Sequence, residues 1–181
     1  QAINNWDVST VTNFGYMFQS ATSFNQDLNS WDVSSATTMT GMFVLATAFN
    51  GNITSWQTNG VTSMSNMFNG TAFNQNISGW DTSTVLDMQG MFRSTPFNHD
   101  ISGWNVSSVG NMYRMFAETS AFNYNISIWN VSSVTNMKEM FSGAWVFNQD
   151  ISGWDVSNVT DMSGMFFSAQ SFNQSLANWD V

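Results

Sequence analysis

Asp155 and Asp161 lie close together in the stretch WDVSNVTDMSGMF, residues 154–166, among serine and threonine hydroxyls. Two carboxyl groups in unlike environments can serve as general acid and general base, which is the chemistry of many hydrolases. Near-copies of the stretch, however, begin at Trp6, Trp31, Trp56, Trp80, Trp104 and Trp129. Because a repeat places its aspartates in like environments, the pattern argues against an acid–base pair, and we predict no catalytic residue.

The other residue types that could do chemistry are scarce. The chain has one histidine, His99, no cysteine and only two glutamates, Glu118 and Glu139. His99 occupies a position that glutamine holds in several other copies of the repeat. We therefore predict that the protein is not an enzyme and has no cofactor.

The repeat has a period of 24 or 25 residues. With its tryptophan as position 1, it reads W-D-V-S-x-V-T-x-M-x-x-M-F-x-x-A-x-x-F-N-Q-D-I-S-G, with apolar residues at positions 1, 3, 6, 9, 12, 13, 16, 19 and 23. A fixed period of this length predicts a solenoid that stacks like positions of successive coils. We expect one repeat domain over residues 1–181, a fragment of a longer array. Its coils start near Trp6, Trp31, Trp56, Trp80, Trp104, Trp129 and Trp154, with a partial coil at Trp179.

Two short elements are expected within each coil. Residues 151–156 alternate in character, which predicts a short strand parallel to those of the neighbouring coils. Val159, Met162, Met165 and Ala169 follow at spacings of three and four, which predicts a short helix or 3-10 turn. The expected fold is a right-handed α/β solenoid of about seven coils, with a parallel β-sheet on one face and short helices or 3-10 turns on the other.

The stretch WDVSNVTDMSGMFFSAQSFNQ, residues 154–174, and its copies resemble the repeats of the BspA-type leucine-rich-repeat surface proteins of bacteria and mycoplasmas. The resemblance covers essentially the whole chain. It implies a leucine-rich-repeat-like α/β solenoid in a secreted or cell-surface setting, among proteins usually discussed as adhesins or surface antigens. The family brings no catalytic residues to this sequence.

The charge balance excludes several classes of partner. Three basic residues stand against 12 acidic ones, a net charge of −9, so nucleic acids and anionic membrane surfaces would repel the chain. No apolar run approaches the roughly 18 to 20 residues that a membrane span needs. Only 8% of the residues are charged, and the abundant Asn, Ser and Thr suit an extracellular or cell-surface protein.

Two sets of polar positions are candidate sites. Stacked carboxylates at position 2 repel one another, and Ca²⁺ between coils would relieve that repulsion, as amide substitution in the middle coils also does. The Ca²⁺ candidates are Asp7, Asp32, Asp155 and Asp180. Position 20 is Asn in every coil, which we interpret as a structural ladder that hydrogen-bonds coil to coil. The ladder consists of Asn25, Asn50, Asn74, Asn98, Asn123, Asn148 and Asn173.

Some residues break the repeat pattern or match a modification motif. Trp145, Tyr113 and Tyr124 are off-pattern aromatics, which serve either as contact anchors or in local packing. Asn-x-Ser/Thr sequons would be glycosylation acceptors in a eukaryotic secreted protein. They occur at Asn52, Asn69, Asn76, Asn105, Asn125, Asn130, Asn158 and Asn173.

These observations lead to three hypotheses of function. The leading one is a non-enzymatic extracellular repeat scaffold for adhesion or recognition, which binds a protein or glycan on another cell or on the matrix. The alternative is a structural filament subunit that self-associates end to end through open solenoid edges. The third is a surface protein stabilised by Ca²⁺.

Overall fold

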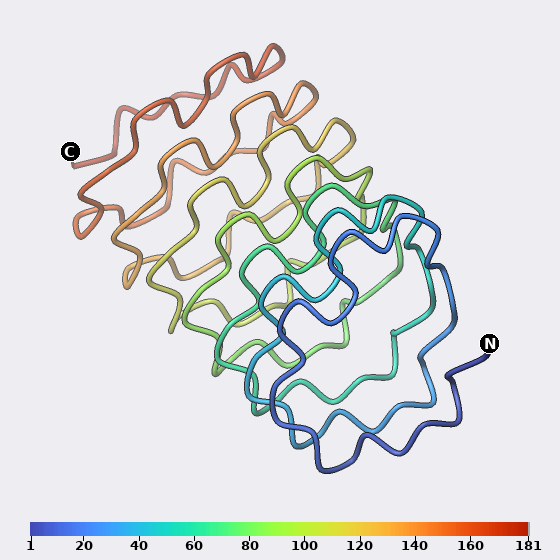
Figure 1. The fold of residues 1–181 in the computed structure, drawn as a ribbon. Coiled ribbons are helices and arrows are strands. Elements are labelled where there is room, and N and C mark those ends of the chain that lie inside the picture. The colour runs from blue at the N-terminus through green and yellow to red at the C-terminus, as the bar shows by residue number, and fades with distance from the viewer. Residues whose placement is uncertain (181) are drawn as a thin grey trace.

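Seven coils of the chain stack along one axis, with the N- and C-termini at opposite ends of the stack (Figure 1). The structure, a computed structural model, describes residues 1–180. Single parallel bridges join position 8 of each coil to position 8 of the next. The bridged residues are Asn13, Thr38, Ser63, Asp87, Asn111, Asn136 and Asp161. Like positions are therefore in register from coil to coil.

Turns make up most of each coil. Residues 1–180 form neither a helix nor a continuous strand, and the bridges at position 8 are the β-type pairings found there. The predicted α/β fold, with its parallel β-sheet and its short helices, is therefore wrong. Side-chain hydrogen bonds and backbone angles explain both errors.

Side-chain turns at the corners of the coil replace the predicted strand. Asp150 Oδ1 accepts the N–H of Ser152 at 3.0 Å, and Asp155 Oδ1 accepts the N–H of Ser157 at 3.1 Å. Such Asx turns bend the backbone, so the segment between them cannot run on as a strand. Equivalent turns recur at positions 2, 8 and 22 of other coils.

Positions 8–16 form a run of turns that we call the turn ribbon, which comprises residues 161–169 in coil 7. Its N–H groups at positions 12, 14 and 16 bond to carbonyls three residues earlier, as Met165 does to Met162 at 3.1 Å. The backbone angle φ is positive at positions 11 and 15, as at Gly164 (64°) and Ser168 (57°). A left-handed residue at every fourth position interrupts the i to i−4 hydrogen bonds of a helix, so the predicted helix does not form.

The other N–H groups of the turn ribbon bond to the following coil. At each of the six junctions, positions 9, 11, 13 and 15 donate to the carbonyls of positions 8, 10, 12 and 14 of the next coil. Glu139 donates to Ser163 at 3.0 Å, for example, and Phe141 donates to Met165 at 2.9 Å. Alternate bonds within and between coils thus satisfy the backbone without helix or sheet.

The core consists of columns of aromatic and methionine side chains. The predicted inward positions are confirmed as buried in the middle coils, as at Met88 and Phe97. Phe92 stacks on Phe97 of the same coil with ring centroids 4.1 Å apart, and on Phe116 of the next coil at 5.7 Å. Each tryptophan of the repeat after the first also donates its indole N–H to a carbonyl of an earlier coil, as Trp104 does to Ile77 at 3.2 Å. Packing and hydrogen bonding together explain why tryptophan recurs.

Candidate recognition face

The ribbon face, which we define as the side chains at positions 10, 11, 14 and 15 of the turn ribbon, differs from coil to coil. Position 1 is always Trp and position 20 is always Asn. Position 11, by contrast, is occupied in successive coils by Tyr16, Gly41, Asn66, Gly90, Arg114, Glu139 and Gly164. Because the backbone repeats while these side chains vary, the ribbon face is the candidate surface for recognition of a partner.

The ribbon face also holds all the positive charge of the chain. Arg93, Arg114, Lys138, Glu118 and Glu139 all lie on it. The ten aspartates lie instead at the corner positions 2, 8 and 22. The face therefore combines charges of both signs, whereas the charged residues at the corners are all acidic.

Two ion pairs on the ribbon face connect neighbouring coils. Arg114 Nε donates to Glu139 Oε2 at 2.7 Å, and its Nη2 lies 2.6 Å from the same oxygen. The Arg114 guanidinium also lies 5.0 Å from the centroid of the Tyr113 ring, in a cation–π contact. Arg93 Nη2 lies 3.2 Å from Glu118 Oε1. Surface pairs of this kind contribute at most about 1 kcal/mol to stability, so their main effect is to fix side-chain positions.

Glu118 is held ionised by its neighbours. The Ser94 hydroxyl donates to Glu118 Oε2 at 2.5 Å and lowers the pKa of that carboxyl, and the positive charge of Arg93 lowers it further, against the opposing effect of partial burial. A carboxyl with a lowered pKa is a poor general acid at neutral pH. Glu118 is therefore suited to binding a donor or a cation.

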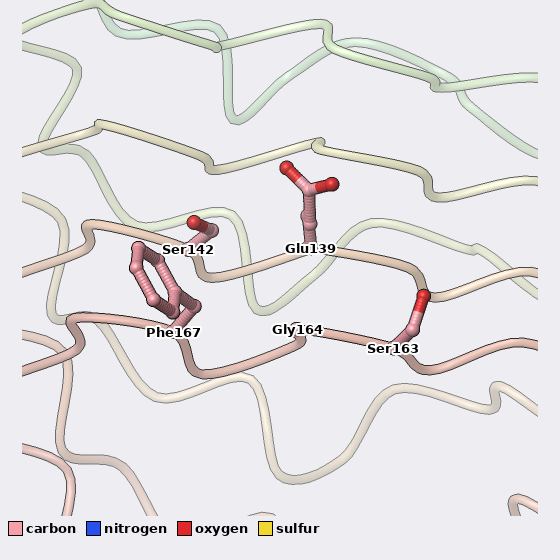
Figure 2. A pocket seen from close by; sticks show the side chains of 5 residues that line it. All are labelled: Glu139, Ser142, Ser163, Gly164 and Phe167. Atoms are coloured by element: carbon pink, nitrogen blue, oxygen red, sulfur yellow. The ribbon is translucent and has the colours of Figure 1, made fainter.

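A notch of about 370 Å³ opens on the ribbon face between coils 6 and 7 (Figure 2). It is lined by Glu139, Ser142, Ser163, Gly164 and Phe167. Phe167, which is 71% exposed, stands beside Ser142, and the Glu139 carboxylate points away from Gly164 (Figure 2). The notch therefore combines an aromatic wall, two hydroxyls and a carboxylate over a floor that has no side chain.

The asparagines at position 20 link successive coils. The N–H of Asn50 donates to Asn25 Oδ1 at 2.7 Å, and that of Asn74 donates to Asn50 Oδ1 at 2.8 Å. Gln75 Nε2 adds a bond to the Asn50 carbonyl at 2.9 Å. The same backbone-to-side-chain bond joins Asn98 to Asn74, Asn148 to Asn123, and Asn173 to Asn148. The side chains of five of them are thus acceptors for the next coil: Asn25, Asn50, Asn74, Asn123 and Asn148.

The Ca²⁺ candidates Asp7, Asp32, Asp155 and Asp180 are exposed corner residues. Among residues 1–180, no three His, Asp or Glu side chains gather where they could hold a metal ion. In Asp7, Asp32 and Asp155 the hydroxyl of the serine two residues later donates to the carboxylate, and its N–H does so too; both bonds lower the pKa of the aspartate. These carboxylates are engaged as turn acceptors within their own coils.

The off-pattern aromatics occupy three different positions of the coil. Tyr113 lies on the ribbon face at position 10, whereas Trp145 and Tyr124 lie beyond the turn ribbon at positions 17 and 21. Trp145 is 54% exposed and Tyr124 is 40% exposed. Tyr16 and Phe167 join Tyr113 on the ribbon face, so that face has aromatics at both ends of the stack.

The Asx turns account for most of the sequons. The Asn residues at positions 2 and 22 use Oδ1 to accept the N–H of the Ser or Thr two residues later. They are Asn52, Asn76, Asn105, Asn125 and Asn130, while Asn69, Asn158 and Asn173 lie at positions 14, 5 and 20. A hydroxyl residue two places after Asn suits the turn itself, so the motif arises here without any need for glycosylation.

Sequence reasoning did not identify the two ion pairs, although the signal for them is present. Arg93 and Glu118 are 25 residues apart, and so are Arg114 and Glu139. Residues one period apart meet across a junction between coils, so opposite charges at that spacing indicate a pair. The notch could not be found in this way because it depends on the direction in which Glu139 points.

Comparison with known proteins gives one match. A family model described as "Mycoplasma protein of unknown function, DUF285" matches residues 1–72, 52–129 and 93–181, which together span the chain. No curated protein and no solved structure matches the chain. Residues 1–180 contain no helix that could cross a bilayer.

Proposed function

The chain belongs to the DUF285 family, and from this premise we propose that it is a non-enzymatic repeat scaffold that recognises a partner outside the cell through its ribbon face. The observation that carries the proposal is the concentration of side-chain variety on that face. The resemblance to BspA-type surface proteins supports the extracellular setting, and so does the largely uncharged polar composition.

The ribbon face has the chemistry of an interface. Tyr and Arg are the residue types most often found as binding anchors, and Tyr113 and Arg114 adjoin there in a cation–π contact. The hydrogen bonds between coils form a continuous series along the ribbon, so the face is rigid. A rigid face loses little conformational entropy on binding, which favours affinity.

The chemistry of the carboxyl groups supports a non-enzymatic role. Asp7, Asp32, Asp155 and Asp161 have lowered pKa values because a serine hydroxyl and its N–H hydrogen-bond to each of them. General acids in hydrolases require the opposite shift, a raised pKa. The aspartates thus match turn formation rather than proton transfer.

Retention of chain-coated beads on immobilised matrix proteins and glycans tests this function. We expect beads that carry the variant Tyr113→Ser/Arg114→Gln/Phe167→Ser to bind at least about tenfold more weakly than the unaltered chain, because the anchors are lost. The control variant Asp32→Asn/Asp155→Asn keeps its corner turns and should bind as the unaltered chain does. The proposal would be contradicted if beads carrying the unaltered chain, the triple variant and the control variant were retained equally. It would also be contradicted if no beads were retained on any surface.

A second candidate, assembly of copies end to end, is favoured by apolar surface on the first and last coils. Trp6 is 52% exposed and Met17 is 41% exposed on the first coil. On the last coil a cavity of about 470 Å³ is lined by residues that include Met165, Phe166 and Trp179. Sedimentation velocity over a wide range of concentrations distinguishes the two candidates: a recognition module remains monomeric, whereas a filament subunit forms long species as concentration rises.

A further inference from the structure

The notch over Gly164 exists because a space that is fully covered in other coils is covered only in part there. A Cβ atom at Gly41 would collide with the Tyr16 ring, and one at Gly90 would collide with the Asn66 side chain. In both cases the side chain at position 11 of one coil leans over the glycine at position 11 of the next. Gly70 is covered in the same way by Leu45 at position 15.

At coil 7 only the stem of the covering side chain reaches the glycine, and its end group is held elsewhere. Glu139 is the neighbour of Gly164 at position 11, and its Cγ lies 3.1 Å from where a Gly164 Cβ would be. Its carboxylate, however, bonds to Arg114 of the coil before, at 2.6 and 2.7 Å. Figure 2 shows the carboxylate directed away from Gly164. The ion pair therefore keeps the notch open.

The molecule itself shows which ligand fits such a space. Tyr16 fills the equivalent space over Gly41 with an aromatic ring. At Gly164 the exposed Phe167 ring supplies a stacking surface, and aromatic pairs of this type contribute about 0.5–1.5 kcal/mol beyond area burial. The Ser142 and Ser163 hydroxyls can accept a hydrogen bond from a ring hydroxyl. The net charge of −9 disfavours an anionic ligand.

We propose that the notch formed by Glu139, Ser142, Ser163, Gly164 and Phe167 binds the side chain of an exposed tyrosine on a partner protein. The ring stacks on Phe167 above Gly164, and the phenolic O–H donates to the Ser142 or the Ser163 hydroxyl. This inference rests on the proposed function, because it names the chemistry that the ribbon face recognises.

Titration of the ¹⁵N-labelled 181-residue chain with N-acetyl-tyrosinamide tests the proposal. We expect amide shifts at Gly164, Ser163 and Phe167 that saturate with a Kd on the order of millimolar, as suits a single side chain. N-acetyl-leucinamide, which lacks both the ring and the hydroxyl, should leave these signals unchanged at the same concentrations. Absence of localised shifts, or equal shifts with both probes, overturns the proposal.

Two variants and a matched control make the test specific to the notch. Arg114→Gln releases Glu139 to lean over Gly164, and Phe167→Ser removes the stacking wall; each should weaken tyrosinamide binding by roughly tenfold. Asp81→Asn, a corner substitution outside the ribbon face that keeps its Oδ1 acceptor, should bind as the unaltered chain does. Unchanged affinity in both notch variants, with otherwise unaltered amide spectra, contradicts the proposal.

The bead assay separates this proposal from the function on which it rests. Loss of bead retention in the triple ribbon-face variant, together with no tyrosinamide binding, would reject the tyrosine site and keep the recognition face. If beads that carry the unaltered chain were not retained on any of the surfaces, the recognition function would be rejected, whatever the titration shows.

Discussion

At the scale of the residue, the recurrent polar side chains and the tryptophans of this protein complete hydrogen bonds that the backbone of a turn leaves open. Asp and Asn accept N–H groups at the corners, Asn at position 20 accepts the N–H of the next coil at five of the six junctions, and tryptophan donates to a carbonyl of an earlier coil. Polar backbone groups near a core are costly when unpaired, so these residue types are required by the fold. Such roles explain their recurrence without any chemistry at a site.

The corner aspartates make the stability of the stack dependent on pH. Their folded pKa values lie below the unfolded value of about 3.9, so their contribution is full above pH 4 and is lost as pH falls through the folded values. The variant Asp32→Asn/Asp155→Asn keeps the Oδ1 acceptors without the charge. We expect its Tm to match that of the unaltered chain at pH 7 and to fall less at pH 3, as followed by tryptophan fluorescence.

The control for this experiment is Asp32→Ala/Asp155→Ala, which loses the acceptors at every pH. Its Tm should be lower than that of the Asp32→Asn/Asp155→Asn variant both at pH 7 and at pH 3. If the Asn and Ala variants had the same Tm at pH 7, the acceptor role of these side chains would be wrong.

The repeat tryptophans should be far more sensitive to substitution than the exposed one. Trp104→Phe removes the indole donor to Ile77 and leaves a void at a site that is only 4% exposed. We expect a loss of about 2–4 kcal/mol in the free energy of unfolding, measured with urea. Trp145→Phe, at a site that is 54% exposed, should change that free energy by less than about 0.5 kcal/mol. Similar losses in the two variants would show that burial and hydrogen bonding of the tryptophan at position 1 do not determine its contribution to stability.

At the scale of the element, the turn ribbon replaces both helix and sheet, and the sequence shows only part of the reason. The apolar spacing of three and four at Met162, Met165 and Ala169 is the same in a helix and in this ribbon. The ribbon differs from a helix in its positive φ angles at positions 11 and 15. The glycines Gly41, Gly90 and Gly164 at position 11 indicate this conformation in the sequence. The hint is incomplete because other coils place larger residues in the same left-handed conformation, which sequence pattern alone does not indicate.

Glycines of the turn ribbon should tolerate substitution less well than glycines at the corners. Gly90 has a φ of 57°, and a Cβ there would collide with Asn66. We expect Gly90→Ala to cost about 1–3 kcal/mol in the free energy of unfolding. A Cβ at Gly103 would meet nothing within 4 Å, so Gly103→Ala should be neutral or stabilising by up to about 1 kcal/mol. Urea unfolding of both variants checks the prediction, and equal effects would contradict the strain argument.

At the scale of the whole molecule, the period of 24 or 25 residues predicted which positions are buried, because a core position in one coil is a core position in all. The architecture around that core could not be predicted in the same way. The corner turns and the ribbon depend on whether each N–H bonds within its own coil or to the next coil. The N–H of Met165 bonds within its own coil, whereas that of Glu139 bonds to the next coil. The periodicity of the apolar residues does not indicate which N–H groups bond within a coil and which bond to the next coil.

Removal of one whole coil should leave a folded, shorter stack. Each coil contacts mainly its neighbours, so stability is close to a sum over coils and junctions. Deletion of residues 80–103 joins Gly79 to Trp104 and keeps every position in phase. We expect a lower Tm with the same near-ultraviolet circular dichroism per coil. Deletion of residues 80–91 alone shifts the phase, and that variant should lose the signal; retention of it would argue against the register described here.

The hydrogen bonds that join the turn ribbons of successive coils run in one direction along the stack, from positions 9, 11, 13 and 15 toward the C-terminal coil. Peptide groups aligned in this way add their dipoles, as they do in an α-helix. The N–H at position 7 points the other way, but only once per coil, so it opposes the sum without cancelling it. The stack therefore has a permanent electric moment, positive toward coil 7, and a charged partner that approaches the ribbon face meets two electrically unlike ends.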